Sequence, residues 1–182
     1  MKITATSIPG PLIIEPDVFE DARGFFFESF NRREFERLSG IAPTFMQDNH
    51  SGSKKNVLRG LHYQIQQSQG KLIQVVAGEI FDVVVDLRKN SPTLGQWIGH
   101  HLSAKNRHML WIPPGFAHGF LSLADPAEVI YKVTDYWAPE HEHCILWNDP
   151  DLAINWPLQG NTPILSQKDQ AAVPFRHAEL FP

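Results

Sequence analysis

The chain has 182 residues, of which 42% are hydrophobic and 20% are charged, as in an ordinary globular protein. A chain of this length buries about 70% of the surface that its unfolded form exposes, so we expect one domain, residues 1–182, with its own core. The net charge of −4 argues against nucleic-acid binding, which needs a basic face. The apolar run around residues 83–85 is far shorter than the about 20 residues of a membrane-spanning helix, so no membrane partner is expected.

The cysteine content indicates the compartment. Cys144 is the only cysteine, so no intrachain disulfide can form and a cytoplasmic location is expected. The first ten residues, MKITATSIPG, lack the continuous apolar stretch of a signal peptide. A lone cysteine before Ile-Leu-Trp is typical of a small buried hydrophobic residue, and a nucleophilic thiol is the less favoured alternative.

One helix is predicted early in the chain. Asn31 can cap its first turn, and Glu34 lies at the third helical position, where a capping box has its acidic residue. Phe35 and Leu38 are three residues apart and share a face. Gly40 is suited to end the helix.

From residue 71 onward the hydrophobic period is closer to two, which is typical of strands. The stretch KLIQVVAGEIFDVVVDLR contains two β-branched runs around residues 77–79, a pattern that predicts a hairpin, and the run at 81–87 reads as a mostly buried strand. Further strands are predicted at 108–112, 119–123 and 128–137, with a turn at 113–115. Several short strands separated by turns favour a jelly-roll sandwich or barrel.

The segment from Pro150 onward is rich in proline and is predicted to wrap the surface. A short helix is predicted after Ser166, which can cap it, with Asp169 at its third position. The expected fold is therefore mainly β, a jelly-roll barrel with a few short helices.

Nine histidines are a high number for this length. The pairs His100-His101 and His141/His143 lie in polar, turn-like surroundings and are predicted to be surface residues. His62 and His118 are different, because apolar residues and glycines surround each of them. They are either satisfied core histidines or members of a site.

A metal site is the first chemical hypothesis for these two histidines. Metal-binding cupins carry a His-x-His pair followed by a glutamate on one strand, with a second histidine motif downstream. Residues 113–118 keep the downstream Pro-x-Gly-x-x-His form, but Gln64 stands where the second histidine of the first motif would be. Most of the ligand set is missing, so no metal is predicted.

A phosphate site is the second hypothesis. The chain has neither a Walker A loop nor a GxGxxG turn after a strand. Isolated cations do recur beside glycines, at Arg23, Arg59 and Lys71. Such groups bind phosphate oxygens, and the alternative is that all three are solvated surface charges.

Proton transfer is the third hypothesis. His62 can act as a base near neutral pH if a carboxylate holds one of its ring nitrogens. Tyr131 or Tyr136 could donate a proton from the opposite face, and Lys71 could stabilise an enolate oxygen. Spacing alone does not show that these side chains converge.

A resemblance to a known family favours the third hypothesis. The chain resembles the dTDP-4-dehydrorhamnose 3,5-epimerases, which are cupin-like jelly rolls. The motifs that carry this resemblance cover nearly the whole chain and lie at residues 15–28, 45–51, 55–62 (KNVLRGLH), 69–72 (QGKL), 81–88, 91–97, 111–120 (WIPPGFAHGF) and 145–150 (ILWNDP).

The resemblance implies an isomerase that needs neither a redox cofactor nor a metal. Its substrate would be a dTDP-linked 4-keto-6-deoxyhexose, whose C3 and C5 protons are acidified by the ketone at C4. The resemblance implies that His62 is the base, with Asp169 as its carboxylate partner. It also implies that Tyr131 is the proton donor and that Lys71 lies near the developing oxyanion.

The resemblance also implies a set of substrate-binding residues and a homodimer. Arg23 and Glu28 would reach the partner subunit's site through an exchanged N-terminal strand. Tyr136 would stack on thymine. The implied substrate-binding residues are Arg23, Glu28, Gln47, Asp48, Asn49, Arg59, Lys71, His118, Tyr136, Glu142 and Lys168.

Three alternatives remain open at the level of sequence. They are a related epimerase that acts on one carbon only, a noncatalytic cupin-like binder of sugar nucleotides, and a metal-dependent cupin dioxygenase. The order of the two inversions, the identity of the main acid tyrosine and the destination of the sugar are not determined by the sequence.

Overall fold

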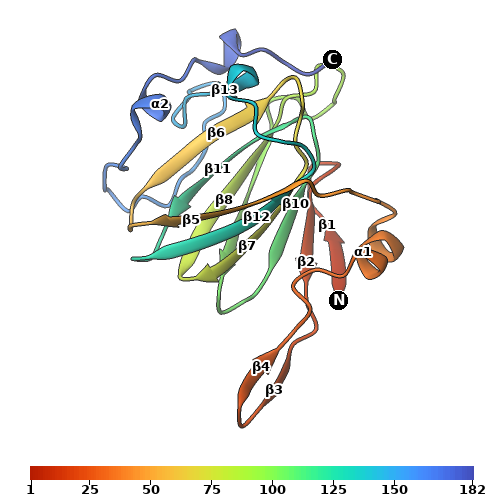
Figure 1. The fold of residues 1–182 in the computed structure, drawn as a ribbon. Coiled ribbons are helices and arrows are strands. Elements are labelled where there is room, and N and C mark those ends of the chain that lie inside the picture. The colour runs from red at the N-terminus through yellow and green to blue at the C-terminus, as the bar shows by residue number, and fades with distance from the viewer.

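The computed structural model describes residues 1–182, and it is mainly β, as predicted. Two antiparallel sheets lie face to face (Figure 1). The six-stranded sheet has the order β1 (Lys2–Ala5), β2 (Leu12–Glu15), β10 (Met109–Ile112), β7 (Lys71–Ala77), β12 (Ala127–Val133) and β5 (Gln47–Ser53). The five-stranded sheet has the order β13 (Glu142–Cys144), β6 (Leu58–Gln64), β11 (Phe116–Ser122), β8 (Glu79–Asp86) and β9 (Trp97–Ser103).

The helices are few and short, again as predicted. They are α1 (Arg32–Ser39), α2 (Gln167–Gln170) and the 3-10 helices η1 (Pro139–His141) and η2 (Phe175–His177). None of them has the length and apolar character that a membrane-spanning helix requires. A separate hairpin of β3 (Phe19–Asp21) and β4 (Gly24–Phe26) projects away from both sheets (Figure 1).

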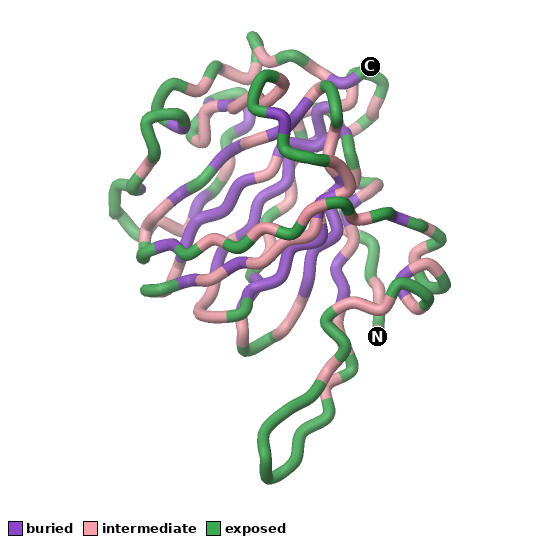
Figure 2. Tube along the Cα trace, viewed as in Figure 1, coloured by how far each residue is buried: buried purple, intermediate pink, exposed green.

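The main core lies between the two sheets. Apolar side chains of both sheets meet there, for example Ile73 and Val129 from the six-stranded sheet and Val84 and Phe120 from the five-stranded sheet. β7, β8 and β11 are buried along most of their length (Figure 2). Burial of such side chains contributes about 1.5–3 kcal/mol each, so this contact is what holds the two sheets together.

The prediction of a hairpin at residues 77–79 is wrong. β7 pairs with β10 and β12, whereas β8 pairs with β11 and β9, so the chain crosses from one sheet to the other at Gly78. Gly78 has a φ of +72°, and a Cβ there would collide with the carbonyl oxygen of Pro126. The local pattern predicts both strands correctly, but the partner of each strand depends on distant residues.

The other predicted strands are displaced by a few residues. The turn at 113–115 lies between β10 and β11, as expected, although β11 begins at Phe116 rather than at residue 119. β12 ends at Val133, four residues before the predicted end, and the following residues form a bend.

The predicted early helix is confirmed as α1. The side-chain oxygen of Asn31 accepts a hydrogen bond from the backbone N–H of Glu34. Gly40 takes the left-handed conformation and donates its N–H to the carbonyl of Glu36. Phe35 is buried against Trp111, with ring centroids 5.6 Å apart, while Leu38 stays partly exposed. Phe35 thus anchors the helix on the outer face of the six-stranded sheet.

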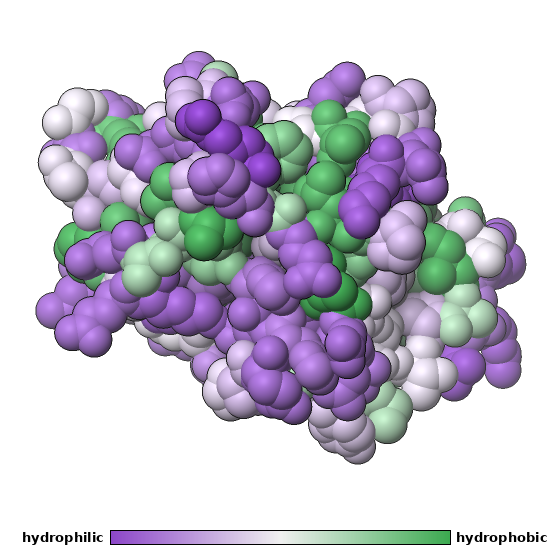
Figure 3. Space-filling model, turned by 90° about the horizontal axis from the view of Figure 1, so that it is seen from above, coloured by the Kyte–Doolittle hydropathy of each residue, from purple (hydrophilic) through white to green (hydrophobic).

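The C-terminal segment wraps the surface, as predicted, and it also closes a second core. Leu152, Trp156 and Phe181 are buried against the outer face of the five-stranded sheet. Seen from above the view of Figure 1, the surface of the protein is mostly hydrophilic, and its hydrophobic side chains lie in separate patches (Figure 3). The predicted short helix is confirmed as α2, where the Ser166 hydroxyl accepts the backbone N–H of Asp169.

An ion pair between a buried carboxylate and a partly exposed arginine stabilises the loop after β8. Asp86 is fully buried and accepts hydrogen bonds from Arg88, Ser91 and Thr93. Burial alone would raise the pKa of Asp86, but these hydrogen bonds outweigh it and lower the pKa to about 2. The carboxylate therefore stabilises the fold above the pKa of the unfolded chain, and this contribution is lost as the pH falls from about 4 to about 2.

We expect Asp86→Asn to lower the free energy of unfolding by about 3 kcal/mol at neutral pH, because it leaves Arg88 without its charged partner. Asp21→Asn is the matched control. Asp21 binds Arg23 through the same three nitrogen atoms, but the pair is exposed on the hairpin. Urea denaturation at neutral pH compares the two variants, and equal stability of both would contradict the expectation.

Candidate active site

A cavity of about 360 Å³ opens between the two sheets. Strands of both sheets, the bend after β12 and α2 all contribute to its lining. Most of the side chains that face it are polar. The predicted residues that line it are Gln47, Asn49, Arg59, His62, Lys71, His118, Tyr131, Glu142 and Lys168.

A bulge in β6 explains how Arg59 and His62 come to the same face. Side chains of a regular strand alternate, so residues three apart would point in opposite directions. In the ladder with β11, however, His62 is opposite His118 while Arg59 is opposite Phe120, so three residues of β6 span two of β11. The extra residue changes the direction in which the following side chains point, as bulges beside active sites often do. Arg59 and His62 therefore both line the cavity.

Gly60 allows this bulge to form. Its φ is +103°, and a Cβ at this position would lie 2.6 Å from the carbonyl oxygen of His118 and 2.7 Å from the Cα of Gly119. Both of these are backbone atoms, so neither can move aside as a side chain would. The Gly60 N–H donates to Oδ1 of Asp169 at 3.2 Å, which ties the bulge to α2.

His62 and Asp169 form a hydrogen-bonded pair. Nε2 of His62 lies 2.7 Å from Oδ1 of Asp169, whose other oxygen accepts the Ser166 hydroxyl at 2.6 Å. Burial would raise the pKa of Asp169, but the hydrogen bonds from His62 and Ser166 outweigh it and lower the pKa to about 2. The ionised carboxylate holds the ring proton on Nε2, which leaves Nδ1 as the basic nitrogen.

Tyr131 reaches the cavity from the other sheet. It lies on β12, opposite Asn49 of β5, and lines the cavity. Burial raises the pKa of its hydroxyl, and the nearby Arg59 opposes this rise. The phenol is therefore protonated at neutral pH and can donate a proton from the face opposite the histidine.

Lys71 lies at the start of β7 beside two carboxylates. Burial lowers the pKa of its ammonium group to about 8, and the charges of Glu142 and Asp82 oppose this fall. Asp82 is buried, and both of its oxygens lie 2.9 Å from Nε2 of His118. The cavity thus contains a second histidine–aspartate pair next to a lysine that is charged at neutral pH.

This pKa gives a pH prediction. If the Lys71 ammonium stabilises negative charge on the substrate, turnover falls as the pH rises through about 8, because the ammonium loses its proton there. Lys71→Arg is expected to move this loss to higher pH, and Lys71→Gln to lower turnover at every pH. The measurement is kcat from neutral to alkaline pH, with the exposed Lys89→Gln as control. An unchanged alkaline limb in Lys71→Arg would contradict the assignment.

The mouth of the cavity carries further polar groups. Arg59 donates from Nε to the Ser53 hydroxyl at 3.0 Å and from Nη2 to the Gly52 carbonyl, so β5 holds its guanidinium in place. Lys168 and Glu142 form an ion pair. Burial would raise the pKa of Glu142, but the hydrogen bonds from Lys168 and Trp137 outweigh it and lower the pKa.

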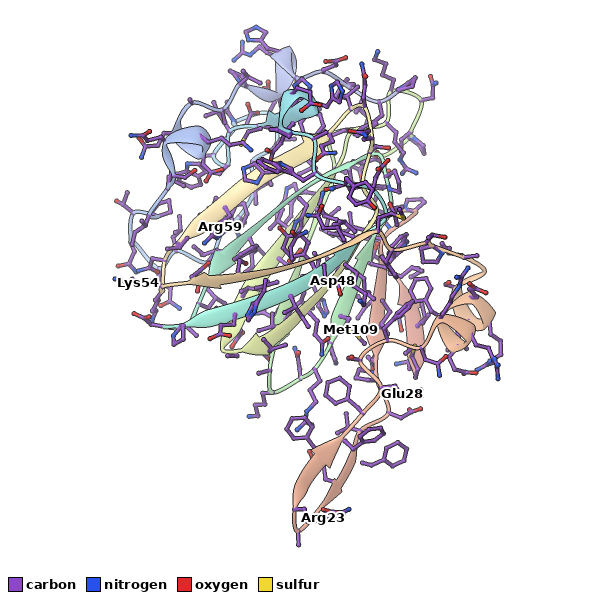
Figure 4. The ribbon with its side chains drawn as sticks, viewed as in Figure 1. Arg23, Glu28, Asp48, Lys54, Arg59 and Met109 are labelled. Atoms are coloured by element: carbon purple, nitrogen blue, oxygen red, sulfur yellow. The ribbon has the colours of Figure 1, made fainter.

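Four predicted substrate-binding residues do not line the cavity of their own chain, and neither does Asp169, which is buried and bonds to His62. Asp48 points to the outer face of the six-stranded sheet and binds Lys132 at 3.0 Å, because it alternates with Gln47 and Asn49 on β5. Arg23 lies at the tip of the hairpin and Glu28 at its base, both away from Arg59 (Figure 4).

Tyr136 is the fourth of these residues. It is 54% exposed and absent from the lining, whereas its neighbour Trp137 lines the cavity and donates from Nε1 to Glu142 at 3.0 Å. The sequence reasoning also missed Ser51, Gln64 and Gln69. For Ser51, the alternation of β5 was a usable signal, since it continues the row from Gln47 and Asn49.

Gln64 stands where metal cupins have a histidine. Its side-chain amide forms hydrogen bonds with backbone groups. Its Nε2 donates to the carbonyls of Gln67 and Tyr136, and its Oε1 accepts the N–H of Ala138. The amide therefore ties two loops together beside the cavity.

The histidines predicted to be surface residues are only partly so. His101 is exposed, but His100, His141 and His143 are half-buried. The His143 ring stacks on Tyr63 at 5.3 Å. Cys144 is also half-buried, and burial, together with the nearby Asp169, raises the pKa of its thiol to about 12, which does not suit a nucleophile.

Comparison with known proteins identifies the family. A family profile described as dTDP-4-dehydrorhamnose 3,5-epimerase matches residues 5–177. The chain belongs to this family. The Pseudomonas aeruginosa protein named dTDP-4-dehydrorhamnose 3,5-epimerase is 58% identical over 100% of both chains.

Solved structures of family members match the fold closely. The 3,5-epimerase from Legionella pneumophila, in complex with dTDP-4-keto-L-rhamnose, is 53% identical, with a TM-score of 0.95 over 98% of this chain and 94% of that one. A 3'-monoepimerase from Streptomyces bikiniensis, in complex with dTDP-quinovose, is 36% identical, with a TM-score of 0.88 over 93% of this chain and 85% of that one. The cupin-like jelly-roll fold is thus confirmed.

Proposed function

We propose that the chain is a dTDP-4-dehydrorhamnose 3,5-epimerase of dTDP-L-rhamnose biosynthesis. It inverts C3 and C5 of dTDP-4-keto-6-deoxy-D-glucose by removing and returning protons, without a cofactor. The observation that carries this proposal is His62, hydrogen-bonded to Asp169 at 2.7 Å, in a polar cavity that Tyr131 lines from the other sheet. The identity of 58% with a named 3,5-epimerase supports the choice of substrate.

The mechanism follows from the acidity of carbons next to a ketone. In our proposal, Nδ1 of His62 removes the proton at C5 and at C3, each of which lies beside the C4 carbonyl. The electrons move onto the C4 oxygen, where Lys71 stabilises the enolate. Tyr131 returns a proton from the opposite face, which inverts the centre.

The nucleotide end of the substrate fits the mouth of the cavity. Arg59, held by β5, and Lys168 supply positive charge for the diphosphate. Gln47 and Asn49 present amide groups beside them. For thymine stacking, Trp137 is better supported than the predicted Tyr136, because it alone of the two lines the cavity.

We also propose a homodimer with an exchanged N-terminal strand. The hairpin of β3 and β4 extends from the body and exposes three large aromatic side chains (Phe19 66%, Phe25 61%, Phe26 68%). Such an apolar surface is typical of a protein interface. Seated on a second copy, it would bring Arg23 and Glu28 to the partner subunit's cavity.

We further propose that the protein is a single domain located in the cytoplasm. One family profile spans residues 5–177, which supports a single domain over residues 1–182. The lone cysteine supports the cytoplasm as the location.

Epimerisation in heavy water, followed by proton NMR, tests the activity. Incubation of dTDP-4-keto-6-deoxyglucose with the enzyme is expected to give deuterium at both C3 and C5, with both centres inverted. Exchange and inversion at one carbon would instead support a single-carbon epimerase, the activity in the name of the Streptomyces bikiniensis relative. Binding without any exchange would support a noncatalytic sugar-nucleotide binder.

A further inference from the structure

Three potential metal ligands converge at the edge of the active site. One ligand atom each of His62, Cys144 and Asp169 lies within 4.8 Å of the other two. The sulfur is 3.8 Å from the carboxylate oxygen, which is 2.7 Å from the imidazole nitrogen. The catalytic scheme proposed above uses the histidine and the aspartate but gives the thiol no part.

The fold fixes this convergence. Cys144 on β13 is directly opposite His62 on β6 in the antiparallel ladder, so their side chains share a face. Asp169 reaches the same point from α2, where Ser166 and the Gly60 N–H hold its carboxylate. Three separate segments thus present nitrogen, sulfur and oxygen to one point.

This donor set suits zinc and related thiophilic cations. Zn²⁺ binds imidazole and carboxylate at about 2.0–2.2 Å and thiolate at about 2.3 Å, in tetrahedral geometry. Ligand atoms of such a site are about 3.3–3.8 Å apart. The sulfur and the carboxylate oxygen already have this separation, and His62 needs to move about half an ångström away from Asp169. The His62 side chain is 30% exposed, so the fourth coordination position can face the cavity.

We propose that His62, Cys144 and Asp169 form an inhibitory site for one thiophilic divalent cation of the Zn²⁺ class. The cation takes the place of the proton between His62 and Asp169. Cys144 binds as thiolate and releases its proton to solvent. The His62 ring stays neutral, so its proton moves from Nε2 to Nδ1.

Inhibition follows from this change of tautomer. Nδ1 is the nitrogen that removes the substrate proton in the proposed mechanism, and with a proton on it His62 is no longer a base. The inhibitory part of this inference therefore rests on the proposed epimerase function, whereas cation binding does not.

Cation binding is tested first, on the full chain and without substrate. Titration with Cd²⁺ is expected to produce the ultraviolet charge-transfer band of a cadmium thiolate at one equivalent. Cys144→Ala is expected to lose the band and to bind Zn²⁺ at least about 100-fold more weakly by calorimetry, since removal of a group that only orients a ligand already costs about 10–100-fold. Cys144→Ser, with its melting temperature checked, serves as a second variant.

The control is an exposed histidine–carboxylate pair. Nδ1 of His101 lies 2.7 Å from Glu79 on the surface. An exposed pair of this kind could bind zinc weakly and nonspecifically. His101→Ala is expected to leave the affinity unchanged. Absence of the cadmium band, or equal Zn²⁺ affinity in wild type and Cys144→Ala, would overturn the site.

Turnover is measured next. Zn²⁺ is expected to abolish deuterium exchange by the wild type at one equivalent, and a chelator is expected to restore it. Cys144→Ala should keep the turnover of the untreated wild type and resist the same concentration of Zn²⁺. Full turnover by a wild type that shows the cadmium band would refute inhibition and leave the proposed activity intact.

Discussion

His62→Asn is expected to reduce epimerisation by about 10²–10⁴-fold, the usual contribution of a positioned base. Asparagine is close to imidazole in size and can still donate to Asp169, but it offers no basic nitrogen to the substrate. Because the base acts mainly in the transition state, kcat should fall while binding of the dTDP-sugar is largely kept. Deuterium uptake at C3 and C5 should fall together, because one base serves both carbons in the proposed mechanism.

The measurement combines calorimetry of dTDP-sugar binding with NMR of deuterium uptake. His101→Asn is the matched control, since that histidine pairs with Glu79 on the surface. Its turnover should equal that of the wild type. Turnover of His62→Asn within a factor of about ten of the wild type would rule out His62 as the base. Loss of exchange at only one carbon would indicate a second base for the other.

Gly60→Ala is expected to lower both stability and turnover. A φ of +103° strains any residue with a side chain, at about 1–3 kcal/mol. The new methyl group would in addition lie 2.6 Å from the His118 carbonyl oxygen, so β6 and β11 must separate. We expect a total loss of at least about 3 kcal/mol in the free energy of unfolding. The bulge that directs the side chains of Arg59 and His62 into the cavity would be disturbed at the same time, which is why turnover should fall.

Gly52→Ala is the control for this change. Gly52 lies on β5, has no positive φ, and a Cβ there would meet no atom within 4 Å. Urea denaturation and kcat are measured for both variants. If Gly60→Ala unfolds at the same urea concentration as Gly52→Ala, the bulge tolerates a side chain at residue 60 and does not require glycine.

Elements that depend on neighbouring residues were predictable from the sequence. The caps of α1 and α2 are examples, because Asn31 and Ser166 each bond to a backbone N–H three residues later. The cross-sheet passage at Gly78 was not predictable, since the sequence pattern identifies strands but not their partners. The prediction of a jelly roll was still correct, because it depends on the number and length of the strands and not on their partners.

The site was predictable in part. His62, Lys71 and Tyr131 were singled out by residue type and surroundings, while Asp169 entered only through the family resemblance. No local pattern could connect Asp169 to a histidine 107 positions away. Trp137 was missed because β12 ends at Val133, and beyond that point the alternation of a strand no longer indicates which side chain faces the cavity.

The position of Asp169 in the chain has a consequence for synthesis. Every strand of both sheets precedes it, so a growing polypeptide can assemble the cavity, with its histidine base in place, while the orienting carboxylate is still inside the ribosome. The dyad forms only when the residues after β13 have docked beside the start of β6 and the end of β13, through bridges such as Val57 with Ile164 and Ile145 with Val173. Proton-transfer competence is thereby linked to completion of this segment, and a partly translated enzyme holds a base without its partner.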